Sequence, residues 1–277
     1  MSNKNTTFSG ITFVEEAPYN LGIALSGGGA RGLAHVGALL AIEEAGLKPD
    51  IIAGVSAGSV VAVLYAAGVK PYTIINMFAR TSFRDFADLN FGGGGLVNIK
   101  KFVAFIESML GDKKHIEDLN IPTFIGATDL DNACPHIFSK GEIAPRMLAS
   151  CSIPIVFPPV KIDGVHYVDG GVLRNLPAWI IRNKCKTLIG INVSPLSRKS
   201  NYSSIIDVAL RTYNLMTKAN QSEDMAICDV VVKTPEIASI APFDLKNIKD
   251  IVISGYTHTR TALKDAGMWP ADKKSDK

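Results

Sequence analysis

The sequence predicts an α/β protein with a mainly parallel central sheet. Two observations support this prediction. Short apolar runs typical of buried strands alternate with longer helical segments, and each of the first two runs leads through a glycine-containing turn into a helix. A strand, a helix and a strand in this order need a crossover connection, which makes the two strands parallel.

The chain is predicted to fold as one domain. Its 277 residues, 47% of them hydrophobic, can form a sizeable core, and no internal repeat divides them. We expect the domain to occupy residues 21–268. An N-terminal lead-in at 1–20 precedes it and a polar tail at 269–277 follows it.

Charge and cysteine content exclude several classes of function. The chain has 29 basic and 26 acidic residues, a balance too even to indicate nucleic-acid binding. Its net charge of +3 is compatible with anionic lipid surfaces. The four cysteines form no C-x-x-C pair, so neither a metal site nor a redox pair is expected.

No targeting or membrane-spanning segment is expected. The stretch at 1–19 is polar and includes Glu15 and Glu16, unlike a signal peptide. No apolar run approaches the ~18 residues that a membrane span requires. The expected location is the cytoplasm, with the protein at most peripheral to a membrane.

The first part of the domain repeats the order strand, turn and helix. The predicted elements are a strand at 21–25, a loop at 26–32, a helix at 33–44, a strand at 50–53, a turn at 54–58 and a helix at 59–67. Both turns therefore stand where a strand ends and a helix begins.

The remainder of the domain continues with mixed helices and strands. Helices are predicted at 71–80, 98–110, 142–150, 177–183, 205–221 and 248–266, and strands at 121–128, 134–138, 165–168, 187–193 and 230–233. The strand at 134–138 is expected to form a hairpin with the strand before it.

The segment at 82–97 has two interpretations. Its aromatic residues recur among charges, and it contains four consecutive glycines. It is either a surface loop whose aromatic side chains tuck against the core, or a lid or lipid-touching flap with the glycines as its hinge.

The turn Gly54-Val55-Ser56-Ala57-Gly58 is the strongest functional motif. It follows a buried strand and leads into an apolar helix, the context in which G-x-S-x-G forms a nucleophile elbow. The glycines allow the turn to be sharp enough to expose the serine hydroxyl at the end of the strand. We therefore predict that Ser56 is a nucleophile; the alternative is a small-residue turn that serves only packing.

A second glycine-rich turn supplies candidate donors for the oxyanion that develops when a serine attacks a carbonyl. A glycine run before a helix presents backbone N–H groups without side chains in the way, and the helix dipole adds positive potential. The candidate residues are Gly27, Gly28, Gly29, Ala30, Arg31 and Gly32.

The same loop also matches the dinucleotide fingerprint G-x-G-x-x-G. That motif needs an acidic residue about 20 positions further on, at the end of the next strand. Asp50 instead stands at the start of the second strand, and the serine elbow occupies its end. Dinucleotide binding is therefore disfavoured.

A serine nucleophile also needs a base. Only His258 follows Asp169 in the order that an α/β-hydrolase triad requires, and it falls inside a predicted helix, which favours a helix-surface residue. His35 is expected to pack beside the glycine loop. Asp169 ends a strand next to Gly170 and Gly171, which clear space around it, so it is a candidate to act directly. No cluster of carboxylates or histidines indicates a metal.

Four sequence blocks, in this order, resemble those of patatin-like phospholipases. They are S-G-G-G-A-R-G-L-A-H, G-V-S-A-G-S, A-S-C-S-I-P-I-V-F-P-P and V-D-G-G-V-L-R-N-L-P, within residues 21–180. The resemblance implies a three-layer α/β sandwich with helices on both faces of a mainly parallel sheet. It also implies a lipid acyl hydrolase with a Ser-Asp dyad that needs no histidine, metal or cofactor.

By this resemblance Ser56 is the nucleophile, Asp169 is the proton acceptor, and the Gly27–Gly32 loop is the oxyanion hole. Arg31 matches the family's basic residue in that loop. It would steady the loop or meet anionic substrate groups; the alternative is a surface charge at the start of a helix.

Two further stretches match the family's pattern. The block at 150–159 would line the site beside the dyad. Asn175 and Pro177 match positions that shape the turn after the aspartate.

The expected function is hydrolysis of carboxylic esters of phospholipids or lysophospholipids. Besides the lipid ester, we expect transient contact with a membrane surface and no nucleic acid; the sequence carries no signal for the oligomeric state. Three alternatives stay open. They are a general esterase, thioesterase or acyltransferase using the same site, a nucleotide-binding regulatory module, and a folded but inactive interaction protein.

Overall fold

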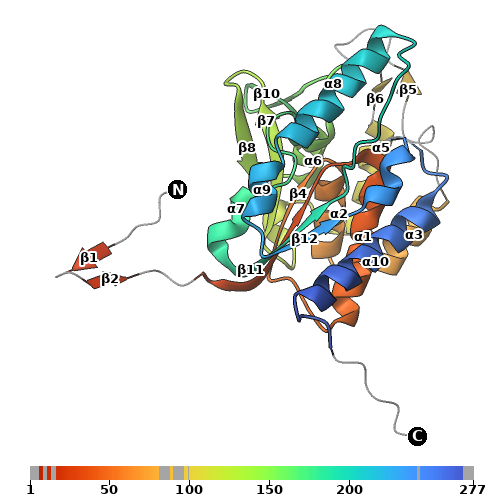
Figure 1. Cartoon of the computed structure of the whole chain (residues 1–277). Coiled ribbons are helices and arrows are strands. Elements are labelled where there is room, and N and C mark those ends of the chain that lie inside the picture. Colours follow the sequence, from red (N-terminus) through yellow and green to blue (C-terminus); the bar gives the residue numbers. More distant parts are fainter. Residues whose placement is uncertain are drawn as a thin grey trace, which may run out of the picture.

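A computed structural model gives the fold of the chain (Figure 1). It describes residues 17–80, 100–241 and 244–270, together with four short strands that form two antiparallel pairs. These strands are β1 (Thr6–Phe8) with β2 (Ile11–Phe13), and β5 (Asp88–Leu89) with β6 (Val97–Asn98).

The centre of the molecule is an eight-stranded sheet with the order β12-β11-β3-β4-β7-β10-β9, in which β8 also pairs with β7. Five strands are parallel: β3 (Tyr19–Leu25), β4 (Ile51–Val55), β7 (Thr123–Asp129), β11 (Cys185–Asn192) and β12 (Val230–Lys233). Three are antiparallel to their neighbours: β8 (Cys134–Phe138), β9 (Val160–Ile162) and β10 (Val165–Asp169). The mainly parallel sheet and the 134–138 hairpin are thereby confirmed.

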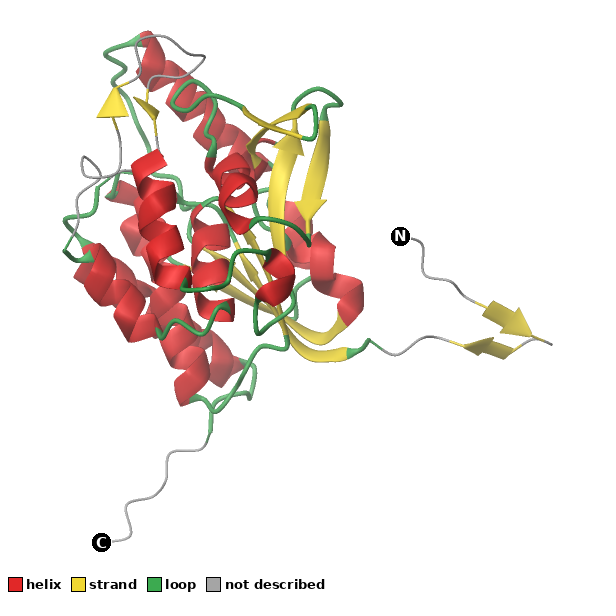
Figure 2. Cartoon of the chain, turned by 180° about the vertical axis from the view of Figure 1, so that it is seen from behind, coloured by secondary structure: helices red, strands yellow, loops and turns green. Residues whose placement is uncertain are grey.

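Helices cover both faces of the sheet (Figures 1 and 2). Ile23 and Leu25 of β3 belong to the larger hydrophobic cluster, whereas Ala24 belongs to a second cluster, because successive side chains of a strand point to opposite faces. The larger cluster includes residues of α1 (Leu33–Glu44), α2 (Ala57–Ala66), α3 (Pro71–Phe78), α5 (Lys100–Leu110), α6 (Ile143–Cys151) and α10 (Ile248–Asp265). The second is covered by α7 (Ala178–Ile181) and α9 (Ser222–Ala226). The predicted three-layer α/β arrangement is confirmed.

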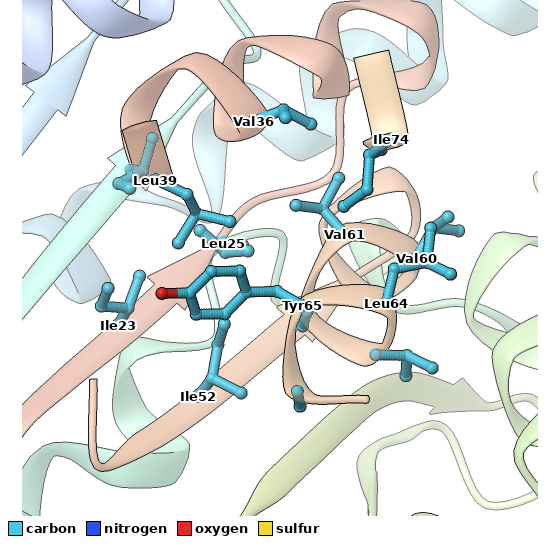
Figure 3. Close-up of a cluster of buried hydrophobic side chains, with 14 of the residues drawn as sticks. Ile23, Leu25, Val36, Leu39, Ile52, Val60, Val61, Leu64, Tyr65 and Ile74 are labelled. Carbon is cyan, nitrogen blue, oxygen red and sulfur yellow. The ribbon is translucent and has the colours of Figure 1, made fainter. Parts of the chain in front are cut away.

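Figure 3 shows how the larger cluster fills the space between the sheet and its helices. The side chains come from strands β3 and β4 and from helices α1, α2 and α3. The labelled residues are Ile23, Leu25, Val36, Leu39, Ile52, Val60, Val61, Leu64, Tyr65 and Ile74, each at most 9% exposed. This burial fixes α1 and α2, the two helices that begin at the glycine-rich turns.

The structure differs from the sequence-based expectations at several element ends. The helix predicted at 205–221 is α8 (Ile205–Ala219), and the short helix α9 that follows it was not predicted. The helix predicted at 177–183 is α7 after Pro177, followed by a 3₁₀ turn. Strand β9 was not predicted. Five 3₁₀ helices complete the described elements: η1 (Gly29–Gly32), η2 (Ile116–Asp118), η3 (Gly170–Val172), η4 (Arg182–Lys184) and η5 (Pro235–Ser239).

The predicted domain limits, 21–268, stay a prediction. Strand β3 already begins at Tyr19, and Trp269 packs against the larger cluster. Inside the predicted lead-in, β1 and β2 form a hairpin. Apart from β5 and β6, the segment at 82–97 lies outside the described residues, so neither of its interpretations is tested.

Two further features bear on the class of protein. All four cysteines are free thiols. Among the described helices, none has the length and apolar character that crossing a bilayer requires.

Candidate active site

Ser56 occupies the sharp turn between β4 and α2. Its backbone has φ 51° and ψ −127°, a left-handed conformation that L residues rarely adopt and that costs about 1–3 kcal/mol. The turn is held by a relay, because the Ser56 N–H donates to Ser150 Oγ at 2.8 Å and Ser150 Oγ donates to the Gly126 carbonyl at 2.7 Å. The strained residue is thus fixed by the neighbouring strand β7 and by α6.

The two motif glycines of the elbow are required by close packing. A Cβ atom on Gly58 would lie 2.3 Å from the Leu25 carbonyl oxygen at the end of β3, and one on Gly54 would lie 2.4 Å from the Gly58 carbonyl oxygen. Helix α2 can therefore start directly against the two parallel strands. Since Ser56 is the N-cap of α2, the positive end of the helix dipole lies at the serine.

The glycine loop follows β3, the strand that pairs with β4. A Cβ atom on Gly27 would lie 3.1 Å from Ser56 Cβ, so the loop backbone passes directly beside the serine. His35 supports the loop from inside: its Nε2 donates to the Ser26 carbonyl at 2.8 Å, and burial lowers the pKa of this ring to about 4. His35 is thus a neutral packing residue, as predicted.

Arg31 fixes the same loop from the other side. Its Nε donates to the Gly28 carbonyl at 3.3 Å and its Nη1 donates to the Pro195 carbonyl at 2.8 Å. The residue is only 6% exposed, and burial lowers its pKa to about 10, so it keeps its charge at neutral pH. The interpretation of Arg31 as a surface charge is wrong, because the side chain is buried.

The backbone N–H groups of the loop differ in their availability. The Gly27 N–H is occupied by the Asn175 carbonyl at 3.2 Å. Within the described residues, the N–H groups of Gly28 and Gly29 have no acceptor, and Gly29 has a φ of 60° that favours glycine. Two free donors therefore stand at the start of η1, which leads into α1.

Asp169 stands at the end of β10 with no exposed surface. Its N–H donates to the Ser152 carbonyl at 2.9 Å, and its Oδ1 accepts the Gly171 N–H at 2.8 Å. Its Oδ2 is buried and, among the described groups, makes no hydrogen bond. Burial raises the pKa of Asp169 to about 6; the Ser56 hydroxyl, the Gly171 N–H and the Tyr213 hydroxyl oppose this rise. The carboxyl group thus faces the elbow serine.

Tyr213 is the site residue that sequence reasoning missed. It lies on α8, and a Cβ atom on Gly171 would be only 2.6 Å from the Tyr213 hydroxyl oxygen. Burial and the neighbouring Asp169 charge raise the pKa of Tyr213 well above its usual value. In the sequence Tyr213 is one apolar position of an amphipathic helix, more than 40 residues from Asp169, so no local signal marked it.

The 150–159 block lies beside these groups. Besides the contacts of Ser150 and Ser152, the Cys151 thiol interacts with the hydroxyls of Ser56 and Ser59, and burial raises its pKa. Ser59 Oγ also donates to the Ser56 carbonyl at 2.6 Å. The block thus packs around the elbow and the aspartate, as the resemblance implied.

Asn175 connects the glycine loop to the turn after Asp169. Its N–H donates to Asn220 Oδ1 at 3.0 Å, and its Nδ2 donates to Ser194 Oγ at 3.2 Å. Its Oδ1 is buried, makes no hydrogen bond to any described group, and would lie 2.5 Å from a Cβ on Gly27 and 3.0 Å from one on Gly171. The amide therefore stands between the two glycine turns.

None of the five histidines hydrogen-bonds to Ser56 or Asp169 in the described structure. His258 lies on α10, where its Nε2 is 2.6 Å from Glu236 Oε2. His115 and His166 pair with nearby aspartates, and the ring of His136 packs on Phe138 and Tyr167. The helix-surface interpretation of His258 is confirmed.

The geometry does not support the alternative of dinucleotide binding. Asp50 precedes β4 and accepts the N–H groups of Asn20 and Leu21, both at 3.0 Å. It therefore lies at the end of the sheet opposite the glycine loop, where it cannot meet a ligand bound there. Among the described residues, no group of three or more His, Cys, Asp or Glu side chains is placed to hold a metal.

Comparison with known proteins agrees with the resemblance of the four sequence blocks. Residues 23–181 match the family model described as patatin-like phospholipase. Lysophospholipase NTE1 of Eremothecium gossypii is 27% identical over 285 residues, which cover 88% of this chain and 18% of that protein. Neuropathy target esterase sws of Drosophila melanogaster is 34% identical over 172 residues, 59% of this chain and 12% of that protein.

Among solved structures, VipD from Legionella pneumophila is similar with a TM-score of 0.51 at 13% identity, over 90% of this chain and 67% of that one. This likeness concerns the fold. The chain spans less than a fifth of the length of the two curated relatives, 18% and 12%.

Proposed function

The chain belongs to the patatin-like phospholipase family, and from this premise we propose that it is a serine hydrolase acting on carboxylic esters of phospholipids or lysophospholipids. The family model spans residues 23–181, more than half of the chain. The observation that carries the proposal is the buried Asp169 carboxylate facing the strained Ser56 elbow, beside a glycine loop with free N–H groups.

In the first step, Ser56 Oγ attacks the ester carbonyl carbon and passes its proton to Asp169. An ordinary aspartate, with a pKa near 3.9, is a weak base for a serine hydroxyl. Here burial raises the pKa to about 6, closer to the working pH, which strengthens the base while leaving it ionised at pH 7. The free Oδ2 is the oxygen that would accept the proton.

The negative charge that develops on the carbonyl oxygen needs donors that are already in place. The N–H groups of Gly28 and Gly29 fit this task, because they have no acceptor within the described residues and follow Gly27, which adjoins the serine. Each such donor contributes roughly 3–4 kcal/mol to transition-state stabilisation. Arg31 would hold the loop carbonyls so that these N–H groups stay directed at the oxyanion.

In the second half of the reaction the protonated Asp169 gives its proton to the leaving alcohol. A water molecule then attacks the acyl-enzyme and transfers a proton to Asp169, and Ser56 Oγ regains a proton as the fatty acid leaves. Tyr213 would hold the carboxylate in position, since its hydroxyl favours the charged form of Asp169.

The substrate class is supported by the names of the relatives. The proteins that match over 88% and 59% of this chain are a lysophospholipase and an esterase. A general esterase, thioesterase or acyltransferase would use the same residues, and no structural observation favours one of them over a lipid ester hydrolase.

Fatty-acid release from lysophosphatidylcholine micelles tests the proposal. We expect turnover by the wild-type chain and a loss of several orders of magnitude in Ser56→Ala. Ser108→Ala is the matched control, because Ser108 Oγ donates only to the Phe105 carbonyl on the outside of α5. Equal turnover by Ser56→Ala would contradict the proposal. Parallel assays with a thioester, or with an added alcohol, identify a thioesterase or an acyltransferase.

A further inference from the structure

Helix α8 has two apolar faces, of which only one is packed. The inner face carries Leu210 and Tyr213, which pack against the 150–159 block. The outer face, called here the outer stripe, carries four exposed apolar side chains that share one side of the helix, with Thr212 between its two ends. Its large side chains are Ile205 (84% exposed), Val208 (49%), Leu215 (49%) and Met216 (40%).

This exposure is concentrated on α8 and the residues just before it. Of the eleven large hydrophobic side chains exposed among the described residues, six lie between positions 202 and 216. They are the four of the outer stripe together with Tyr202 and Ile206. A contiguous apolar face of this kind marks an interaction surface, whereas scattered exposed residues do not. In Figure 1, α8 lies in the upper part of the molecule, away from α1, α3 and α10.

An exposed residue of the 150–159 block also lies next to α8. Ile155 is 48% exposed and has a φ of 75°, a conformation that is a clear outlier for a β-branched side chain. Its neighbours Ile153, Val156 and Phe157 pack on the inner face of α8. The strained loop therefore holds an isoleucine in water next to this helix.

The charges around the outer stripe are basic. Four cations lie between 198 and 218, but the same stretch has one acid, Asp207, which is already paired with Lys199 at 3.1 Å. Arg198, Arg211 and Lys218 form no ion pair within the described residues. Arg211 and Lys218 lie on the polar side of α8, where long basic side chains can reach phosphate groups while the apolar side enters the lipid.

We propose that the outer stripe of α8 docks the protein on an anionic phospholipid surface. A lipid surface supplies both an apolar interior for the stripe and negative charges for the three uncompensated cations. A second copy of the chain fits less well, because a symmetric contact would bring the like charges of the stretch 198–218 together, where the one acid, Asp207, is already paired with Lys199. Nothing in this docking needs the membrane to be spanned.

The inference rests on the proposed function for its purpose. Tyr213 on the inner face of α8 interacts with Asp169, so the helix that meets the lipid also covers the dyad. Docking of α8 on the lipid surface therefore brings the helix that covers the dyad to the surface that holds the lipid esters. The docked helix raises the local concentration of a substrate that is itself part of the surface.

Co-sedimentation with vesicles tests the docking. The vesicles contain phosphatidylcholine with or without phosphatidylglycerol, and the protein is the full chain carrying Ser56→Ala so that the vesicles stay intact. We expect binding to the anionic vesicles, and at least about a tenfold loss of affinity in a further Val208→Ser/Leu215→Ser variant, because two apolar side chains that would enter the lipid are removed. Arg211→Gln/Lys218→Gln should reduce the preference for phosphatidylglycerol.

The matched control is Ile253→Ser, which removes an equally exposed apolar side chain (50%) from a different helix, α10, and should bind like its parent. Equal vesicle binding by the stripe variant and its parent would overturn the proposal. So would a dimer in solution that the stripe variant abolishes, with no vesicle binding by the parent.

Separate measurements test the proposed function and the proposed membrane docking. Turnover of a short water-soluble ester by the chain with native Ser56 reports the dyad alone, and the stripe variant should keep it while losing turnover on vesicles. No soluble turnover at all would contradict the proposed function and leave the docking result standing. Thermal unfolding shows that each variant is folded.

Discussion

At the scale of single residues, the buried Asp169 carboxylate determines the chemistry. It has no exposed surface, its Oδ1 is bound to the Gly171 N–H, and its Oδ2 has no hydrogen bond in the described structure. Such a group costs folding free energy when it is charged and is retained where the charge is used. Replacing Asp169, the proposed base, should therefore raise the stability of the protein and lower its activity.

Asp169→Asn should be more stable than the wild type at pH 8 and much less active. Burial raises the pKa from 3.8 to about 6, so the folded state binds the proton more tightly than the unfolded state. Stability is thus lost as pH rises from about 4 to about 6, a cost of about 3 kcal/mol that persists above that range and that asparagine avoids. Turnover should fall by roughly 10²–10⁴.

Calorimetry at pH 8 and pH 5, together with ester turnover, checks this. The gain in melting temperature should shrink at pH 5, where the wild-type carboxyl is largely protonated. A variant that is less stable at both pH values and keeps its activity would show that Asp169 is a structural aspartate.

Tyr213→Phe should move the pH profile of the enzyme. The base must be ionised, so kcat/KM of the wild type should fall as pH drops through about 6. Removing the Tyr213 hydroxyl removes a group that favours the carboxylate, so the midpoint should shift to higher pH. Tyr72→Phe, at an exposed position of α3, is the control. An unchanged midpoint in Tyr213→Phe would mean that the tyrosine only packs.

At the scale of elements, the site depends on how closely α2 approaches the sheet. Gly58→Ala tests this, because the added Cβ would lie 2.3 Å from the Leu25 carbonyl oxygen. We expect destabilisation by about 1–3 kcal/mol or more. Helix propensity alone predicts the opposite sign, since alanine in a helix is favoured over glycine by about 1 kcal/mol. Denaturant unfolding of the wild type and of Gly58→Ala measures the change in the free energy of unfolding. A more stable variant would contradict the proposed close packing of α2 against β3.

The elements around the nucleophile were predictable because their signals are local. The strand, turn and helix about Ser56 and about the glycine loop each combine an apolar run with glycines, and α1 and β12 were predicted with the bounds observed. Strand β9 was missed, because it is three residues long and is defined by pairing with β10. Helix α9 was also missed, because it has only five residues.

The candidate site was predictable only in part, because only some of its residues carry a local sequence signal. Ser56 and Asp169 stand in motifs, but what surrounds them is brought in by the tertiary fold. Tyr213 comes from α8, and Arg31 was known by position while its burial against Pro195 was not. Burial also sets the pKa of Asp169, a property that no local pattern encodes.

At the scale of the whole molecule, different helices cover the hydrophobic core and the proposed active site. Helices α1 and α10 bury the larger hydrophobic cluster, whereas α8 joins the proposed dyad on its inner face to the exposed outer stripe. The curated relatives extend far beyond this domain. The chemistry proposed here needs only residues of the described chain, which makes it testable on this chain alone.

The most direct test of the central claim is labelling with a fluorophosphonate, followed by mass spectrometry of the intact protein and its peptides. We expect one adduct, on Ser56, that is absent from Ser56→Ala and forms much more slowly in Asp169→Asn. A folded wild-type chain that takes up no label, or a label that persists in Ser56→Ala, would contradict it.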